Sequence, residues 1–415
     1  MKTVLLIAIP LALAIQEGEH SSQPRDDDIP EDISQEDIEA IERALDLDDD
    51  DEIDEAPRPR ETEREVPRSV PSAASMNPEI SLIANFALAA FSSEPRQTGA
   101  HDPLETGFNF QQLELAATSA VDPYFRLDAF VVFSLFGVEV EEAYGTTLAL
   151  PFNLQARIGQ FLTRAGRINP THPHEWLFED QPLVLGKFFG GENNRGLGVE
   201  LSWLAPLPWY VEALWSINDG RGASTARSFW GADTLAVDSP LDFQNLLAVR
   251  QFFTLSDDLS LMLGLTGITG PNPTGPYNRT DIYTADAYLR WRPIAKGRGD
   301  RHVSLQAEAW NRRRQVPGDI LVDYGGYAYA VWRFALRWET GVRAEAVTGI
   351  ENDPLDPDWT GTRQRYSAVL TFRPTEFSRL RLQAARDDAA WFEETGYSIF
   401  LATELGIGAH AAHPF

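Results

Sequence analysis

Apolar and polar side chains alternate along most of this chain, from Pro78 to the C-terminal Phe415. The alternation is clearest in residues 335–349. There, a mainly apolar set, Leu336, Trp338, Thr340, Val342, Ala344 and Ala346, alternates with a mainly charged set, Arg337, Glu339, Gly341, Arg343 and Glu345. A period of two is typical of a β-strand with one apolar and one polar face. Strands of soluble proteins usually have about five or six residues, whereas a strand that crosses a bilayer at a tilt needs roughly nine to eleven. The length of the segment therefore predicts a membrane-spanning strand.

The same alternation predicts sixteen strands, an even number, as in single-chain bacterial barrels. We expect them at residues 79–91, 106–120, 124–135, 138–149, 152–165, 196–205, 209–218, 241–254, 259–269, 280–293, 302–314, 320–332, 335–348, 362–373, 378–387 and 396–408. Tight links alternate with long connections, and in such barrels the short turns face the periplasm while the long loops face outward. Aromatic residues such as Trp209, Tyr210 and Trp332 fall at strand ends, where membrane-interface girdles lie. The predicted fold is all-β, a transmembrane antiparallel β-barrel of about 16 strands.

The N-terminus has the features of an export signal. Lys2 precedes an apolar run that ends at Ala14, and Ala12 and Ala14 form an A-x-A cleavage signal. The run is too short for a spanning helix, and no later stretch has the roughly 18 consecutive apolar residues that one needs. We expect a signal peptide at 1–14, an acidic segment with a linker at 15–77, and the barrel at 78–415. The predicted location is the outer membrane of a Gram-negative-type bacterium, with the acidic segment in the periplasm.

The formal net charge of −27 is unevenly distributed. Residues 17–65 hold 22 acidic and five basic residues, whereas the barrel region is closer to balance. Low hydrophobicity with high charge predicts that this acidic segment is mostly disordered. A periplasmic protein is a candidate partner for it. The total charge therefore does not predict what the lumen attracts. The chain has no cysteine, which excludes disulfides and thiolate metal sites, and we expect no nucleic-acid partner.

Two stretches resemble known outer-membrane proteins. Residues 107–115 with 121–126 are similar to the second and third strands of phosphate-selective-porin-like barrels, and residues 169–176 with 180–183 resemble a subgroup labelled zinc-regulated (TonB-dependent) outer-membrane receptors. The resemblance implies a sixteen-stranded channel, trimeric if it follows the porins. An energy-coupled receptor has a folded plug and about 22 strands, so the porin side of the resemblance is favoured. A barrel of sixteen strands leaves an aqueous channel, and the implied function is passive passage of small solutes.

The expected register places many charged side chains in the lumen. The inward arginines are Arg290, Arg292, Arg337, Arg343, Arg363, Arg365, Arg373, Arg379 and Arg381, and the inward acids are Glu212, Asp286, Glu308, Glu339 and Glu345. Because guanidinium groups stay charged and bind carboxylate or phosphate, this excess predicts a weak preference for anions. The alternative is an arginine–glutamate ladder that only stiffens and solvates the wall.

The long connection 166–195 is rich in apolar side chains, among them Trp176, Phe188 and Phe189, and we expect it to fold into the mouth of the barrel. His172, His174 and Glu175 lie close together in it, and imidazole with carboxylate suits a zinc ion. A second interpretation is that these histidines are ordinary turn residues.

We find no nucleophile elbow, no H-E-x-x-H helix and no P-loop, so we expect no enzyme. The predicted function is an outer-membrane porin-like channel for small hydrophilic solutes. The alternative is a barrel that binds or takes up zinc through the 166–195 loop. A third interpretation is a blocked barrel that serves as a structural anchor, which the acidic segment tethers to a periplasmic partner.

Overall fold

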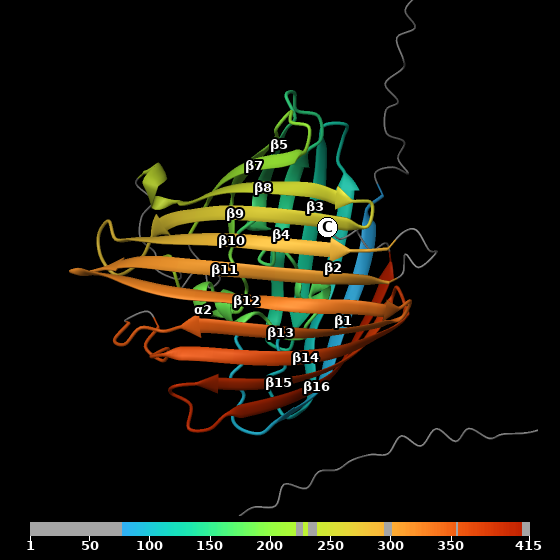
Figure 1. Ribbon diagram of the computed structural model, residues 1–415. Coiled ribbons are helices and arrows are strands. Elements are labelled where there is room, and N and C mark those ends of the chain that lie inside the picture. Colours follow the sequence, from blue (N-terminus) through green and yellow to red (C-terminus); the bar gives the residue numbers. More distant parts are fainter. Residues whose placement is uncertain (1–76, 221–226, 231–238, 294–300, 354–355, 409–415) are drawn as a thin grey trace, which may run out of the picture. The chain divides into compact units, whose positions relative to one another are not determined.

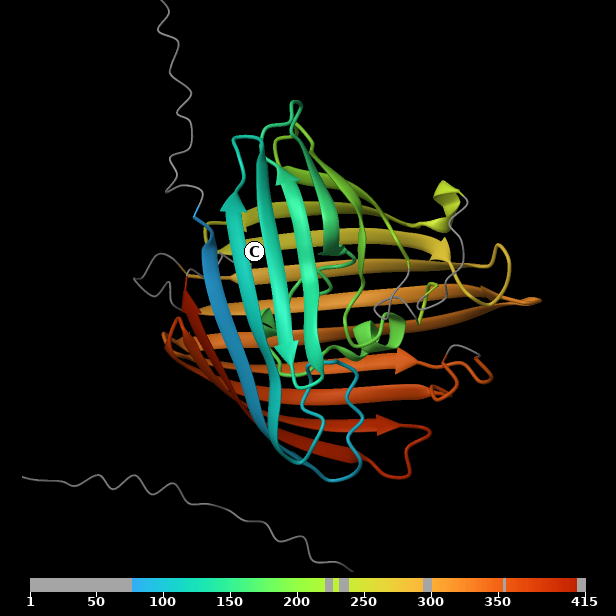
Figure 2. The same ribbon diagram turned by 180° about the vertical axis from the view of Figure 1, so that it is seen from behind.

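Sixteen strands close into a barrel in the structure of this protein, a computed structural model that describes residues 77–220, 227–230, 239–293, 301–353 and 356–408. Each strand pairs antiparallel with its neighbours in sequence, and β1 pairs with β16 to complete the ring. Figures 1 and 2 show this wall from opposite sides. The all-β barrel of 16 strands is therefore confirmed. The predicted signal peptide 1–14, the acidic segment up to residue 76 and the terminal Phe415 lie outside the described residues.

The strands are β1 Glu79–Phe91, β2 Gly107–Ala120, β3 Phe125–Ser134, β4 Gly137–Thr147, β5 Leu154–Leu162, β6 Arg195–Leu204, β7 Tyr210–Asn218, β8 Gln244–Ser256, β9 Leu259–Pro271, β10 Arg279–Trp291, β11 His302–Val316, β12 Asp319–Ala335, β13 Trp338–Thr348, β14 Thr362–Thr375, β15 Ser378–Ala389 and β16 Gly396–Gly408. The described helices are short: η2 Pro173–Glu175, α2 Leu183–Phe188 and η4 Pro240–Asp242. Among the described residues, no helix is long and apolar enough to cross a membrane.

Strand β5 is shorter at both ends than the predicted strand. It begins at Leu154 because Phe152 and Asn153 have φ angles of 62° and 58° and belong to the preceding turn. It ends at Leu162, where the chain leaves the wall and enters the barrel. The predicted strand ran to residue 165, because the sequence there is still compatible with alternation.

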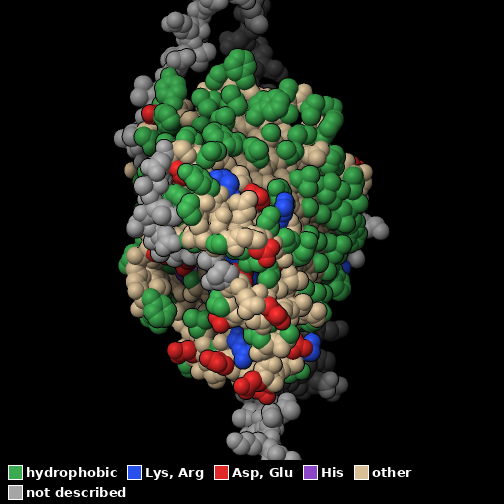
Figure 3. Space-filling model, turned by 90° about the vertical axis from the view of Figure 1, so that its left-hand side faces the viewer, with side chains coloured by type: hydrophobic (Ala, Val, Ile, Leu, Met, Phe, Trp, Pro, Cys, Tyr) green, Lys and Arg blue, Asp and Glu red, His purple; other side chains and the backbone are tan. Residues whose placement is uncertain are grey.

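The two faces of the wall differ in polarity, as the alternation predicts. Along β13, Val342 is 59% exposed on the outer face, whereas the neighbouring Arg343 is 4% exposed and points into the barrel. Figure 3 looks onto the end that carries the long loops. Hydrophobic side chains form its upper and right-hand margins, and charged side chains gather in the middle and along the lower rim. The wall therefore separates an apolar exterior from a polar interior.

Most short connections and most long loops lie at opposite ends of the barrel. Residues 257–258 and 376–377 turn at one end, whereas 163–194 and 349–361 lie at the other. The short-turn end carries aromatic side chains, with the rings of Trp338 and Phe372 4.6 Å apart. Aromatic side chains at strand ends are what a membrane interface favours.

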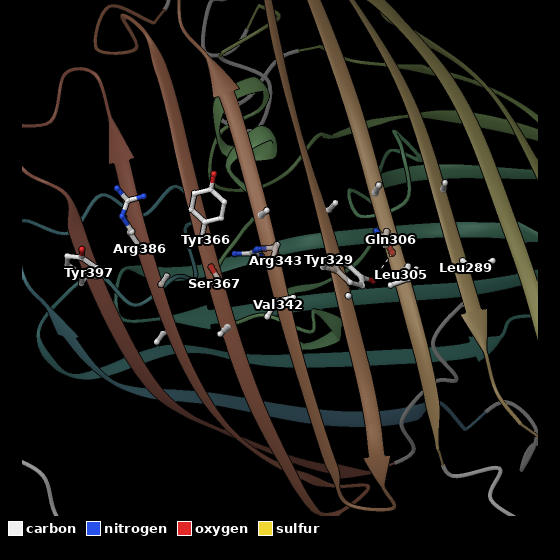
Figure 4. Close-up of a pocket in the computed structure, with 18 residues that line it drawn as sticks. Leu289, Leu305, Gln306, Tyr329, Val342, Arg343, Tyr366, Ser367, Arg386 and Tyr397 are labelled. Atoms are coloured by element: carbon white, nitrogen blue, oxygen red, sulfur yellow. Dashed lines mark hydrogen bonds between the residues drawn. The ribbon is translucent and has the colours of Figure 1, made fainter.

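The outer wall is hollowed over β10 to β16, as Figure 4 shows. The hollow has a volume of about 950 Å³. Its outward-facing lining is mostly alanine and other apolar residues: Ala287, Leu289, Leu305, Ala307, Ala328, Ala330, Val342, Ala344, Tyr366, Ala368 and Ala384. Because these side chains face away from the lumen, the hollow suits hydrocarbon and is not a site for a hydrophilic solute.

Candidate functional site

The segment between β5 and β6 folds into the barrel, and we call residues 163–194 the inward loop. Its two ends are clamped together by Asn169, whose side-chain amide donates to the carbonyl oxygens of Thr163 (2.7 Å) and Asn194 (2.9 Å). The backbone N–H of Asn194 donates back to Oδ1 of Asn169 at 2.7 Å. All three residues are fully buried. Because a buried amide that loses its partner carries a desolvation penalty, these bonds fix where the loop enters the lumen.

Asp180 attaches the inward loop to the arginine-bearing wall. Its carboxylate contacts Arg343 on β13 at 2.5 Å and Arg365 on β14 at 2.9 Å, and it accepts a hydrogen bond from Gln383 at 2.7 Å. Burial alone would raise the pKa of Asp180, but Arg365 and Arg343 lower it to about 2. The lowered pKa means that this attachment is complete above about pH 4, the ordinary pKa of an aspartate, and is lost only as the pH falls toward 2.

A second attachment lies next to the first, on β15. Arg381 contacts the Glu179 carboxylate at 2.6 Å and donates to the carbonyl oxygen of Trp176 at 2.7 Å. Arg379 donates to the carbonyl oxygen of His174 at 2.7 Å and pairs with Glu404 on β16. The loop backbone therefore lies along the inward faces of β13 to β16.

The middle of the inward loop builds an apolar cluster inside the barrel. Helix α2 packs against β12 and β13, and the rings of Phe188 and Phe189 lie 6.3 and 5.8 Å from the ring of Trp310 on β11. Inward residues of the facing strands join the cluster, among them Leu214, Leu246 and Ile268. A Cβ added to Gly325 on β12 would lie 2.6 Å from the Val184 side chain, so glycine permits the close approach of α2. The cluster narrows the lumen on the side of the long loops.

A polar cavity of about 990 Å³ lies on the other side of the loop. It reaches the short-turn end of the barrel, since its lining includes Glu79 and Tyr210, the first residues of β1 and β7. Arginines gather where the loop enters: the Arg164 guanidinium pairs with Glu200 and Glu212, and Arg250 donates to the carbonyl oxygens of Arg164 and Gly166. Arg167 lies over the Tyr288 ring, 4.1 Å from its centroid. The cavity wall thus has charges of both signs.

The two loop histidines meet carboxylates of the wall. His172 Nδ1 lies 3.1 Å from Glu141 and its Nε2 lies 2.9 Å from Glu142, both on β4, and His174 Nδ1 lies 3.1 Å from Glu114 on β2. Burial lowers the pKa of His172, but Glu114 and Glu141 raise it well above the ordinary value. The Glu175 carboxylate, predicted to join the histidines, instead accepts the backbone N–H of His172 at 3.4 Å.

The structure brings four of the nine predicted lumen arginines to the inward loop. Besides Arg343, Arg365, Arg379 and Arg381, it pairs Arg363 with Asp387 at 2.5 Å and Arg373 with Glu339 at 3.5 Å. Two predicted residues lie outside the strands and are exposed: Arg292 follows β10, and Arg337 lies in the turn before β13. Arg290 is half-buried on β10.

The predicted acids also bind the loop or its arginines. Glu308 accepts the backbone N–H groups of Arg167 at 3.1 Å and Ile168 at 2.8 Å. Glu345 accepts the backbone N–H of Leu183 at 2.7 Å and pairs with Arg365 at 3.1 Å. Asp286 is buried on β10. These ion pairs and hydrogen bonds resemble the arginine–glutamate ladder, which was the alternative to an anion-attracting lumen.

Sequence reasoning missed the partners of the histidines, Glu114, Glu141 and Glu142. The available signal was the doublet of acids in β4, which interrupts the alternation of Val138, Glu139 and Val140.

Comparisons with known proteins agree with this architecture. No protein-family model matches the chain. The structure is similar to the outer membrane channel DcaP of Acinetobacter baumannii, with a TM-score of 0.55 and 11% identity over 81% of this chain and 99% of that one. It is also similar to the anion-selective porin of Comamonas acidovorans, with a TM-score of 0.52 and 9% identity over 80% and 99% of the two chains. OprB of Pseudomonas putida matches with a TM-score of 0.52 and 9% identity over 80% and 94%. These likenesses establish a porin fold.

One relative is similar in sequence as well. An uncharacterized protein of Aquifex aeolicus (strain VF5) is 30% identical over 381 residues, which cover 81% of this chain and 80% of the relative. The chain therefore belongs to the same family as this Aquifex aeolicus protein, and it has the fold of the outer-membrane porins.

Proposed function

We propose that this protein is a porin-like channel of an outer membrane, through which small hydrophilic solutes pass without covalent chemistry. The observation that carries the proposal is the closed barrel of 16 strands with an apolar outer face and a charged interior. A barrel of this size can enclose an aqueous path, and charged groups along such a path tune which solutes pass. The likeness to the channel DcaP supports the same function.

The inward loop sets the width of the path. It is attached to β13, β14 and β15 by ion pairs, and its apolar cluster occupies the lumen on the side of the long loops. The polar cavity is the wide part of the path, and the loop is the constriction. We therefore infer a channel of low conductance for small solutes, in which movement of the loop would enlarge the opening.

We further propose a weak preference for anions. Most arginines of β13 to β15 are engaged in ion pairs, and Arg164 pairs with Glu200 and Glu212, so the preference rests on Arg167 and Arg250 at the loop entrance, which line the cavity. Glu200 and Glu212 offset part of this charge. A guanidinium keeps its charge at any working pH, and the preference should therefore persist from acid to neutral conditions.

Planar-bilayer recording of the purified full chain tests both the channel and its preference for anions. We expect small, steady conductance steps, and a reversal potential of the anion-selective sign under a salt gradient. Replacing Arg250 with glutamine should shift the reversal potential toward the cation side, because it removes one charge from the loop entrance. The matched control is Arg386→Gln, whose side chain is on the outer wall near the hollow. A bilayer without any steps would contradict the channel, whereas cation selectivity would contradict only the anion preference.

We propose that three copies associate, that the acidic segment lies in the periplasm, and that it binds a partner there. Native mass spectrometry in detergent should report the mass of three chains, and a tag placed before residue 77 should be protected from protease in intact cells. The phosphate-selective or zinc-regulated subgroup, and uptake of zinc as a second function, stay predictions.

A further inference from the structure

Two groups of metal-binding side chains meet between the inward loop and the wall of β2 and β4. In one group, ligand atoms of Glu114, Glu141 and His172 all lie within 4.8 Å of one another. In the other, ligand atoms of His101, Glu141 and Glu192 do so. Glu141 belongs to both groups. A carboxylate has two oxygens, so this residue can serve two neighbouring cation positions.

The first group has the spacing of a metal site. His172 Nδ1 lies 3.1 Å from Oε2 of Glu141 and 3.5 Å from Oε2 of Glu114. Ligands bind zinc at about 2.0–2.2 Å, so two ligands of one ion lie roughly 3–4 Å apart. All three side chains are at most 5% exposed. Small shifts would bring the three ligand atoms around one ion.

The far side of the His172 ring is oriented as metal-binding histidines are. Its Nε2 lies 2.9 Å from Oε2 of Glu142, on the side of the ring opposite the first group. Metal-ligating histidines usually donate the N–H of the second ring nitrogen to a carboxylate, which fixes the tautomer and strengthens the ligand. Phe130 stacks on the same ring, with centroids 4.7 Å apart, and holds its plane.

A β-bulge in β4 places two consecutive carboxylates, those of Glu141 and Glu142, next to His172. In the ladder of β3 with β4, Phe130 pairs with Glu142 and Val131 pairs with Val140, so Glu141 is the extra residue. In a regular strand, Glu141 and Glu142 would face opposite sides of the wall, and one would enter the membrane. The bulge turns both inward, and each is 4% exposed.

Polar atoms in both groups lack a partner among the described residues. Glu114 is 1% exposed, and its Oε1 accepts no hydrogen bond. Neither ring nitrogen of His101 makes a hydrogen bond, and its closest carboxylate oxygen, on Glu192, is 3.6 Å away. Buried polar groups are nearly always satisfied, so an unsatisfied carboxylate oxygen beside two imidazoles requires an explanation.

The geometry points to a binding site for divalent cations of the zinc type, with Glu114, Glu141 and His172 as ligands of one ion and Glu141 shared with a neighbouring position formed by His101 and Glu192. Imidazole and carboxylate are the donor set that zinc accepts, and a divalent cation offsets the charge of the buried carboxylates. Because His172 is on the loop and the glutamates are on the wall, a bound ion would join the two.

The test is zinc content and affinity of the full chain in detergent, after removal of metal with a chelator and dialysis against zinc chloride. We expect the wild type to retain at least one zinc ion per chain. Glu114→Gln and His172→Gln should each weaken binding by at least about tenfold, because even loss of an outer-shell partner usually costs that much. The matched control is His302→Gln on β11, which belongs to neither group and should bind as the wild type does.

Two further measurements keep the result interpretable. A cobalt-substituted sample should give visible absorption bands, which should be absent in Glu114→Gln. Heat-modifiable electrophoretic mobility checks that each variant forms a barrel; if His172→Gln does not, Glu141→Gln decides, with an expected fall in zinc content. Wild type that retains no zinc, or variants that bind it as well as wild type, would overturn the proposal. Because metal content is measured in detergent, either result leaves the channel proposal untouched.

Discussion

Replacing Asp180 with alanine should release the inward loop and raise the single-channel conductance. The Asp180 carboxylate is fully buried between Arg343 and Arg365, at 2.5 and 2.9 Å. Removing one partner of a buried ion pair usually costs about 3–5 kcal/mol, because the remaining charge is left in a place that excludes water. This cost applies while the inward loop lies against β13 and β14, and it does not apply once the loop has moved away. We therefore expect larger and noisier conductance steps in planar bilayers.

The control for this experiment is Asp388→Ala. Asp388 pairs with Arg386 at 3.0 Å, but both side chains are 44% exposed, and such a pair contributes only about 0–1 kcal/mol. Its conductance should equal that of the wild type. If Asp180→Ala forms a barrel and conducts as the wild type does, the loop is not the constriction and its ion pairs serve only the stability of the wall.

Arginine in place of Val342 should prevent stable insertion into the membrane. Val342 is at the middle of β13, 59% exposed on the outer face, and pairs with Ala330 and Ala368 of the neighbouring strands. An arginine at the bilayer midplane on the lipid face of a barrel costs about 2–4 kcal/mol. We expect a large loss of heat-modifiable barrel in outer-membrane fractions and a lower urea midpoint in lipid vesicles.

The same substitution in the adjacent turn provides the control. Leu336 lies between β12 and β13, outside both strands, and is 63% exposed. Because this turn is at the end of the barrel, Leu336→Arg should place its charge in water and leave assembly unchanged. Equal stability of Val342→Arg and Leu336→Arg would contradict the assignment of the outer face of β13 to lipid.

The wall could be predicted from the sequence because its determinants are local. A strand that separates hydrocarbon from water must have alternating apolar and polar side chains. In segments such as 335–349, this alternation shows which side chains face outward. The pairing of strands such as β8 with β9 and β14 with β15 follows from their short connections. The bulge in β4 was also visible in principle, as the interruption of alternation at Glu141 and Glu142.

The interior could not be predicted in the same way, because its contacts join residues far apart in the chain. The sequence indicated that the 166–195 segment folds inward, but nothing in it pairs Asp180 with Arg343, or His172 with Glu142 rather than with Glu175. Arginines such as Arg343 and Arg365 are buried inside the barrel, where the alternation places them, yet their role depends on which loop atoms contact them. Arg379, for example, binds a loop carbonyl oxygen that no pattern in β15 suggests.

The attachments of the inward loop on two sides have a mechanical consequence. Asp180 and Glu179 hold it to β13–β15, while His172 and His174 hold it to β2 and β4. The loop thus acts as a brace between two parts of a thin cylinder that are separated along the wall by β16 and β1. A hollow tube of single-sheet thickness ovalises readily under lateral pressure, whereas a braced tube resists squeezing along the direction of its strut. The bilayer should therefore deform this barrel less easily along the line that joins these two parts of the wall than in other directions.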